Sequence, residues 1–225
     1  MSDLLGAVAT LAKLHKPGRM LNDPLQLILW ENIGYLIDDE RRALLFDEFQ
    51  TRVGLTPTAI MKTKDSVLAD ISKRGGMNPG VRVERWRKIA AIAASSGDSD
   101  LRSALKALPL LKARSLLKKF PAIGDPGADK VLLFSGIEVR PALESNGLRA
   151  MLRLGLVPVG RSYAASYREA VAALRQDGKP TRSWFIRAYS LLRAHGQTLC
   201  KRTKPQCLAC PLDSACAHLM LASLY

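Results

Sequence analysis

The sequence predicts an all-α fold, and several observations support this class. Apolar residues recur at helical spacing, as Trp86 and Ala93 do within 81–94, and that period marks the buried face of a helix. No segment shows the sustained apolar–polar alternation of a half-buried strand. Helix starts are also visible, because Asp23 followed by Pro24 places a capping carboxylate before a proline at the first helical position. We therefore expect helices packed on helices.

The expected helices can be placed in order along the chain. They are a segment around 27–29, then 43–50, one that begins at 56–57, and then 81–94, 101–108, 110–120, 128–135 and 145–154. A polar run at 38–42 precedes the second of these helices, and glycine-bearing stretches at 74–76 and 97–98 mark breaks. The chain is therefore expected to consist of many short helices.

Composition and charge narrow the class of protein. The chain has 225 residues, of which 48% are hydrophobic and 24% charged, which is typical of a globular protein and not of a disordered one. Lys and Arg number 34 against 20 Asp and Glu, a net charge of +14, which attracts nucleic acid or an anionic membrane surface. A basic surface that only aids solubility is the alternative. We find no apolar stretch of about 20 residues and no secretory signal, so we expect a cytoplasmic protein.

All four cysteines lie close together near the C-terminus, at Cys200, Cys207, Cys210 and Cys216. They are separated by six, two and five residues, and so tight a cluster in an intracellular protein favours metal over a disulfide framework. Four thiolates can hold zinc or a 4Fe–4S cluster. Zinc ribbons use two Cys-x-x-Cys pairs and this chain has one, so the spacing favours iron–sulfur. Three basic residues fill the first loop: Lys201, Arg202 and Lys204. They suit a DNA phosphate, or are simple surface charge.

A helix, a tight glycine-bearing turn and a second helix follow one another at 110–120, 121–127 and 128–135. This order predicts a helix-hairpin-helix, in which Asp125 caps the second helix and Pro126 takes its first position. Backbone N–H groups in such a turn bind a phosphate, although a plain helical corner would look similar. The candidate DNA-binding residues of the turn are Ile123, Gly124, Gly127 and Ala128.

Taken together, these motifs resemble the helix-hairpin-helix DNA glycosylase superfamily, and endonuclease III in particular. His195 ahead of the cysteines, the 6-2-5 spacing and Pro211 resemble its C-terminal iron–sulfur loop, which the adenine-mismatch glycosylases share. Residues 120–124, Phe-Pro-Ala-Ile-Gly, resemble the family hairpin Leu-Pro-Gly-Val-Gly. Residues 143–146, Leu-Glu-Ser-Asn, with Arg149 beyond, resemble the segment that carries the family aspartate. The resemblance covers nearly the whole chain.

The resemblance implies an all-helical fold in two domains that flank a DNA-binding cleft. Residues 21–135 would form a central helical barrel with the hairpin at about 110–135, and residues 1–20 with 136–225 would form the iron–sulfur domain. A 4Fe–4S cluster would be bound by the four cysteines, and damaged double-stranded DNA would be the partner. A flipped nucleotide would enter a pocket. We expect a monomer, associated with the nucleoid if the source is bacterial, and no membrane partner.

Two departures from the family pattern bear on catalysis. Pro126 stands where bifunctional members have the lysine that attacks the sugar, so a monofunctional enzyme with water as nucleophile is expected. Lys130, one turn further on, is a candidate substitute amine, a phosphate contact or a surface lysine. Glu144 replaces the family aspartate, and it would activate water or stabilise the cationic sugar. Alternatively, Glu144 caps the helix at 145–154 or pairs with a basic neighbour.

A further family segment lies after the first barrel helix. Asn32 aligns with an amide that fills the gap left by the flipped nucleotide, and Trp30 and Tyr35 could stack on a base. Glu31 is a second candidate carboxylate, and core packing is the alternative for Trp30.

The sequence therefore supports a monofunctional base-excision-repair DNA glycosylase as the first hypothesis. The alternatives are a damaged-DNA-binding protein with little or no catalysis, a bifunctional glycosylase that uses Lys130 as an AP lyase, and a DNA binder whose cluster senses redox state.

Overall fold

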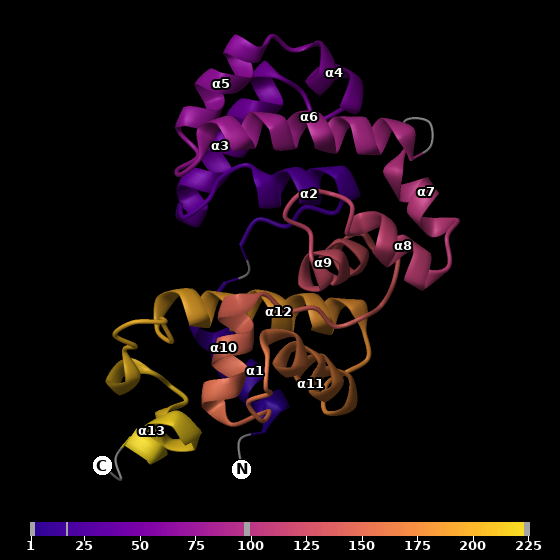
Figure 1. The fold of residues 1–225 in the computed structure, drawn as a ribbon. Coiled ribbons are helices and arrows are strands. Elements are labelled where there is room, and N and C mark those ends of the chain that lie inside the picture. Colours follow the sequence, from indigo (N-terminus) through magenta and orange to yellow (C-terminus); the bar gives the residue numbers. More distant parts are fainter. Residues whose placement is uncertain (1–2, 17, 97–99, 223–225) are drawn as a thin grey trace. The chain divides into compact units, whose positions relative to one another are not determined.

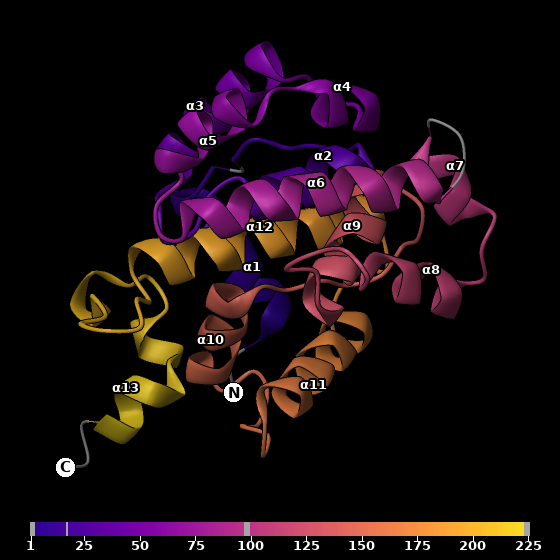
Figure 2. The same ribbon diagram turned by 45° about the horizontal axis from the view of Figure 1, so that its top comes forward.

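The structure is a computed structural model that describes residues 3–16, 18–96 and 100–222. Helices form nearly all of its regular structure, and within those ranges no strand occurs beyond an isolated bridge between Tyr35 and Gly76. Figures 1 and 2 show helices packed on helices in each part of the chain. The all-α prediction is therefore confirmed. None of the described helices has the length and hydropathy needed to cross a membrane.

The contacts within the chain divide it into two compact units. One, called here the hairpin unit, is Leu21–Glu138, and the other, called the cysteine unit, combines Met1–Met20 with Val139–Tyr225. The boundary between the two units was expected after Ser135, and in the structure it lies after Glu138. Backbone N–H groups of Ile137 and Glu138 both donate to the carbonyl oxygen of Leu132, at 3.1 and 3.2 Å, and these bonds keep both residues on the hairpin unit.

The hairpin unit is built from helices α2 to α9. Their bounds are α2 Pro24–Asn32, α3 Asp39–Arg52, α4 Pro57–Lys62, α5 Asp65–Lys73, α6 Pro79–Ser95, α7 Leu101–Lys106, α8 Leu110–Leu117 and α9 Asp125–Ser135. Its core is aromatic at the centre, where Phe49 and Trp86 meet edge to face with ring centroids 4.7 Å apart. The segment expected to form a single helix after Thr56 forms two, because the backbone turns extended at Thr63. The break expected at 97–98 lies outside the described residues.

Polar caps explain where several of these helices begin. Asp23, Asp38 and Thr56 each accept a hydrogen bond from the backbone N–H three residues further on, at 2.9, 2.7 and 3.2 Å. Such caps satisfy N–H groups that have no partner within the helix. The Asp23 cap and the proline that follows it are as the sequence predicts.

The cysteine unit packs helices from both ends of the chain. Its elements are α1 Leu4–Leu14, α10 Ser145–Leu154, α11 Tyr163–Gln176, α12 Arg182–Thr198, the 3₁₀ turns η1 Cys207–Ala209 and η2 Asp213–Ala215, and α13 Ala217–Ala222. Helix α12 packs against both α10 and α1, as Figure 1 shows. At the α10–α12 crossing a Cβ on Gly196 would lie 2.4 Å from the carbonyl oxygen of Asn146. Only glycine fits there, so the close crossing brings Asn146 next to the residues that precede the cysteines.

Candidate functional site

The α8–α9 hairpin has the predicted order, with its turn between Leu117 and Asp125. Ala122 adopts a left-handed backbone with φ +58°, a conformation that favours glycine. Ile123 is buried, and its side chain lies against Gly127. The Ile123 side chain therefore packs within the hairpin, and its N–H donates to the carbonyl oxygen of Phe120 at 3.2 Å, so Ile123 is not a free phosphate donor.

The first turn of α9 differs from the expectation in its cap. Gly124, not Asp125, is the N-cap residue, and Asp125 is the first residue of the helix. Asp125 instead accepts from Arg114 at 3.2 Å and from Lys118 at 3.1 Å. It is an acidic group beside the N–H groups of a helix N-terminus, where a bound phosphate would also lie.

The backbone of this turn also narrows the set of phosphate donors. Ala128 is buried, and its N–H donates to the carbonyl oxygen of Gly124 at 2.9 Å. The expectation that Ala128 donates to a phosphate is therefore wrong. The N–H groups of Gly124, Asp125 and Gly127 lie in the first turn, where a helix offers no internal acceptor. These three are the N–H groups the hairpin can present to a phosphate.

Asn32, at the end of α2, lies inside the hairpin unit. It is 3% exposed, and its Nδ2 donates to the carbonyl oxygens of Ile28 at 3.0 Å and Pro121 at 2.9 Å. The side chain expected to fill a gap in DNA therefore ties α2 to the hairpin turn. Trp30 packs edge to face on Phe46 at 5.4 Å between ring centroids, in agreement with the packing alternative.

Lys130 and Glu31 form an ion pair between α9 and α2, with Nζ and Oε1 2.5 Å apart. The lysine is 9% exposed, and its Nζ lies 5.8 Å from the ring centroid of Phe134. Both residues are named as catalytic or pocket candidates by the sequence, and the structure brings them together. The pair joins α9 to α2, the helix that Asn32 ties to the hairpin turn.

Two loops of the hairpin unit form an exposed apolar tip, which contains the predicted stacking candidate Tyr35 and two residues that sequence reasoning missed, Leu36 and Met77. Tyr35 is 55% exposed, Leu36 73% and Met77 56%. Leu36 has a left-handed backbone with φ +58°, as does Asn78 at +57°. The loops are joined by the N–H of Tyr35, which donates to Gly75 at 2.9 Å. Strained backbone that presents apolar side chains is a signal of function, and only the structure reveals it.

The loop that carries Met77 is fixed by a buried cation. Arg82 donates to the carbonyl oxygens of Ser72, Gly75 and Met77, at 2.5, 2.6 and 2.8 Å. Because one guanidinium binds three of its carbonyl oxygens, the backbone of this loop is restrained. The exposed tip is therefore carried by a fixed backbone.

Glu144 caps the N-terminus of α10. Its Oε1 accepts from the N–H of Gly147 at 2.7 Å, and its Oε2 accepts from Nδ2 of Asn146 at 2.8 Å. Burial raises the pKa of this carboxyl above its ordinary value, although the Gly147 bond, the charge of Arg193 and the Asn146 bond oppose that shift. Each carboxylate oxygen can accept two hydrogen bonds, so the cap leaves Glu144 able to accept one from water.

A chain of hydrogen bonds runs from Glu144 to the first cysteine. Asn146, which donates to Glu144, accepts on its Oδ1 from Nη2 of Arg149 at 2.7 Å. Arg149 also donates to the carbonyl oxygens of Gly196 at 2.6 Å and Cys200 at 3.0 Å. The candidate carboxylate and the cysteine loop are thus held by the same guanidinium.

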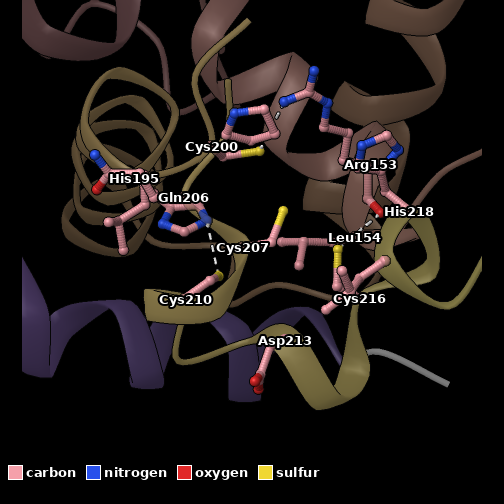
Figure 3. A pocket seen from close by; sticks show the side chains of 13 residues that line it. Arg153, Leu154, His195, Cys200, Gln206, Cys207, Cys210, Asp213, Cys216 and His218 are labelled. Atoms are coloured by element: carbon pink, nitrogen blue, oxygen red, sulfur yellow. Dashed lines mark hydrogen bonds between the residues drawn. The ribbon is translucent and has the colours of Figure 1, made fainter. Parts of the chain in front are cut away.

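The four cysteines line one pocket in the cysteine unit. Figure 3 shows Cys200, Cys207, Cys210 and Cys216 around this space with His195 and Arg153. All four are free thiols, and Cys216 is buried. Burial raises the pKa of the Cys210 thiol, with a small opposing effect from the N–H of Leu212.

The four thiols have the donor chemistry of an iron–sulfur cluster, whose irons are each bound by one cysteine. Among the described residues no three His, Cys, Asp or Glu side chains form a group that could hold a metal ion. The fit to a polynuclear group thus rests on the chemistry of the thiols.

Arg153 fixes the backbone of the basic loop, 201–204, through hydrogen bonds. Its guanidinium donates to the carbonyl oxygens of Lys201 at 2.6 Å and Arg202 at 3.1 Å, and it lies 3.7 Å from Sγ of Cys200. The side chains of Lys201, Arg202 and Lys204 are exposed. The loop backbone is thus fixed while its cations face solvent.

Together, these features define an all-helical, two-unit protein with a helix-hairpin-helix and a four-cysteine pocket. Solved structures share this fold. A trapped covalent intermediate of endonuclease III with DNA matches with a TM-score of 0.75 at 17% identity, over 99% of this chain and 100% of that one. A non-covalent endonuclease III–DNA complex matches with a TM-score of 0.76 at 17% identity, over 100% of both chains.

A thermostable thymine-DNA glycosylase is also similar, with a TM-score of 0.73 at 17% identity over 97% of both chains. No protein-family model matches the sequence, and no curated protein sequence does. The protein has the endonuclease III fold, and that fold extends over the whole chain.

Proposed function

We propose that this protein is a monofunctional DNA glycosylase of base-excision repair. The observation that carries the proposal is the match to DNA-bound endonuclease III over the full length of both chains. The net charge of +14 supports a polyanionic partner. Its substrate would be a damaged or mismatched base in double-stranded DNA, bound by a monomer in the cytoplasm.

DNA binding is assigned to the hairpin and the basic loop. The N–H groups of Gly124 and Gly127 would receive a backbone phosphate, because a helix N-terminus combines free donors with a positive dipole end. Lys201, Arg202 and Lys204 would contact phosphates from their fixed loop. Such contacts position the protein without reading sequence.

Base release would use water and Glu144. The carboxylate, held by Gly147 and Asn146, would accept a proton from water that attacks C1′ of the sugar, and its charge would stabilise the cationic sugar as the base departs. Two fixed donors restrict its rotation, so its orientation is set before the substrate binds. The pKa raised by burial brings this base closer to neutral pH, where a general base works best.

No strand cleavage is expected to follow. Pro126 has no amine to attack C1′, and the amine of Lys130 lies in an ion pair with Glu31. An amine held in that pair is not directed at a sugar carbon. The product would therefore be an intact abasic site.

We further propose that Cys200, Cys207, Cys210 and Cys216 hold a 4Fe–4S cluster. When bound, the group would supply structural cross-links among the segments that carry the four cysteines, and it would offer one-electron redox chemistry. Arg153 and Arg149 hold the loop backbone from the protein side. The basic loop would lose its fixed shape without these supports.

The test uses labelled duplexes that carry oxidised pyrimidines, uracil, alkylated purines or 8-oxoguanine pairs. Each reaction is split and read with and without hot alkali. Strand breaks that appear only after alkali, and disappear in Glu144→Gln, would support the proposal and name the substrate. Breaks without alkali, trapped by borohydride and lost in Lys130→Ala, would replace it with a bifunctional enzyme.

The second candidate is a damaged-DNA-binding protein without catalysis. The capping role of Glu144 favours it, since a cap accounts for this carboxylate without any reaction. This candidate predicts salt-sensitive binding to abasic or distorted duplexes and no base release from any lesion.

A further inference from the structure

His195 of α12 lies directly against the cysteine pocket. Its side chain is buried, and its Nε2 lies 3.7 Å from Sγ of Cys210; the contact is the dashed line beside Cys210 in Figure 3. Sulfur is a large, soft acceptor, and hydrogen bonds to it are longer than those to oxygen. Among the described contacts of the pocket, the imidazole of His195 is the ring with a nitrogen within hydrogen-bond distance of a cysteine sulfur.

A second histidine lies behind the first. The rings of His15 and His195 have centroids 5.9 Å apart and planes inclined at 58°. His15 follows α1 and lines a groove with Met20, Arg182 and Arg187. His15 thus lines the groove and His195 lines the cysteine pocket, and both lie within the cysteine unit.

Each histidine has one buried nitrogen that lacks a hydrogen-bond partner within the described part of the chain, Nε2 of His15 and Nδ1 of His195. Buried polar atoms of native proteins are almost always paired, with protein or with an ordered water. A single water bonded to both nitrogens would give each of them a partner.

The hydrogen-bonding roles of the His195 nitrogens follow from their neighbours. A neutral imidazole has one donor nitrogen and one acceptor nitrogen. A thiolate at Cys210 can only accept, which places the hydrogen on Nε2 and leaves Nδ1 to accept from the water.

We propose that His195 is a tuning residue for the metal group of the cysteines. Its Nε2–H donates to the Cys210 thiolate, and a water shared with His15 holds it in that tautomer. A hydrogen bond withdraws charge from the sulfur, and the bonds to cluster sulfurs are among the factors that set the reduction potential. The bond from His195 therefore raises the potential. This inference rests on the proposed cluster.

The experiment starts from the wild-type protein. Iron and acid-labile sulfide are measured first, and absence of iron overturns both the cluster and this inference. With iron present, pulsed EPR on protein labelled with ¹⁵N-histidine detects a nitrogen coupled to the cluster. The same spectrum is recorded on His218→Gln, because His218 also lines the pocket. A coupling that persists in His218→Gln assigns the signal to His195; loss of the coupling there overturns the inference.

Voltammetry of variants with full iron content then measures the shift. In His195→Leu the potential should fall. In His195→Gln, whose amide N–H can replace Nε2–H, it should return toward the wild-type value. His15→Leu retains the Cys210 contact but removes the water bridge, so a smaller fall is expected. Two outcomes would show that the hydrogen bond does not tune the group. In one, His195→Leu has the same potential as the wild type; in the other, the potential falls equally in the Leu and Gln variants. If His195→Leu fails to hold iron, the inference is tested by the potential of His195→Gln and by the EPR coupling of the wild type. A wild-type protein without the coupling would overturn it.

Discussion

Arg149 donates from Nε to the carbonyl oxygen of Cys200 at 3.0 Å and from Nη2 to Oδ1 of Asn146 at 2.7 Å. One guanidinium thus positions both the first cysteine and the amide that orients Glu144. A disturbance at either end can therefore reach the other through directed hydrogen bonds.

The arginine is tested by a matched pair of substitutions. Arg149→Met should lower both iron retention and base release, each by about 10–100-fold, which is the usual effect of removing a partner that orients a metal ligand. Arg153→Met also removes a support of the cysteine loop but does not touch Asn146. It should lower iron retention, but samples of this variant that still hold iron should release the base at the wild-type rate. Equal losses of base release in iron-replete samples of both variants would contradict the link through Asn146.

The raised pKa of Glu144 predicts how stability varies with pH. A carboxyl whose pKa is higher in the folded protein than in the unfolded chain stabilises the fold fully below the unfolded value, and this contribution is lost as pH rises through the folded value. Glu144→Gln retains a carbonyl that can cap Gly147 but cannot ionise, so the variant does not lose this stability as pH rises. We therefore expect the variant to melt above the wild type at pH 7 and the difference to shrink as pH falls towards 4. Calorimetry across this range measures it, and a difference that grows on acidification would contradict the sign.

Asp125 should weaken DNA binding, because its carboxylate lies at the helix end that would bind a phosphate. Asp125→Asn should tighten binding to an abasic duplex by about two- to fivefold, in line with one charge near a helix N-terminus. Fluorescence anisotropy at fixed salt measures the change. Asp177→Asn, an exposed carboxylate at the end of α11, is the control and should change little. Weaker binding in Asp125→Asn would show that Asp125 supports the hairpin through Arg114 and Lys118 instead.

Ala122 has a backbone conformation that glycine adopts more easily. Ala122→Gly should stabilise the protein by about 1 kcal/mol, since the left-handed region costs non-glycine residues about that much. The matched control is Ala94→Gly on an exposed position of α6, where glycine should cost about 0.5–1 kcal/mol. Denaturant unfolding of both variants compares the signs. Destabilisation by both would mean that the turn does not have this conformation in solution.

The exposed tip should serve DNA binding at the expense of stability. Leu36→Gly relieves a left-handed leucine and should raise the melting temperature, yet it should weaken binding to a distorted duplex because an apolar contact with unstacked bases is lost. Leu44→Gly, an exposed leucine on α3 that is 66% exposed, should lower stability and leave binding unchanged. Unchanged binding in Leu36→Gly would remove the tip from the DNA-contacting surface.

Several features could be read from the sequence because they depend on neighbouring residues. Helical periodicity, the Asp23 cap and the order of the hairpin are local, and the structure has each of them. The Asp125 cap was wrong because a glycine at 124 begins the helix one residue earlier, a choice that local propensity does not decide. The cysteines are clustered in the chain itself, so their shared pocket follows from short-range geometry.

Other features depend on residues that are distant in sequence. Lys130 meets Glu31 across 99 positions, and Asn32 reaches Pro121 across 89; no pattern within either segment predicts these bonds. Both residues were predicted to face DNA or substrate. In the structure Lys130 links α9 to α2, and Asn32 links α2 to the hairpin turn. The link from Glu144 to Cys200 likewise exists only because Gly196 lets α12 approach α10 closely.

By itself, the sequence determined the helical class, the basic charge, the hairpin and the set of four cysteines, because these properties lie in composition and short-range order. Tertiary structure alone decided which polar side chains are buried against partners and which face solvent. Burial depends on what another segment brings to the same place. The assignments of Asn32, Lys130, His195 and the exposed Leu36 therefore had to come from the folded chain.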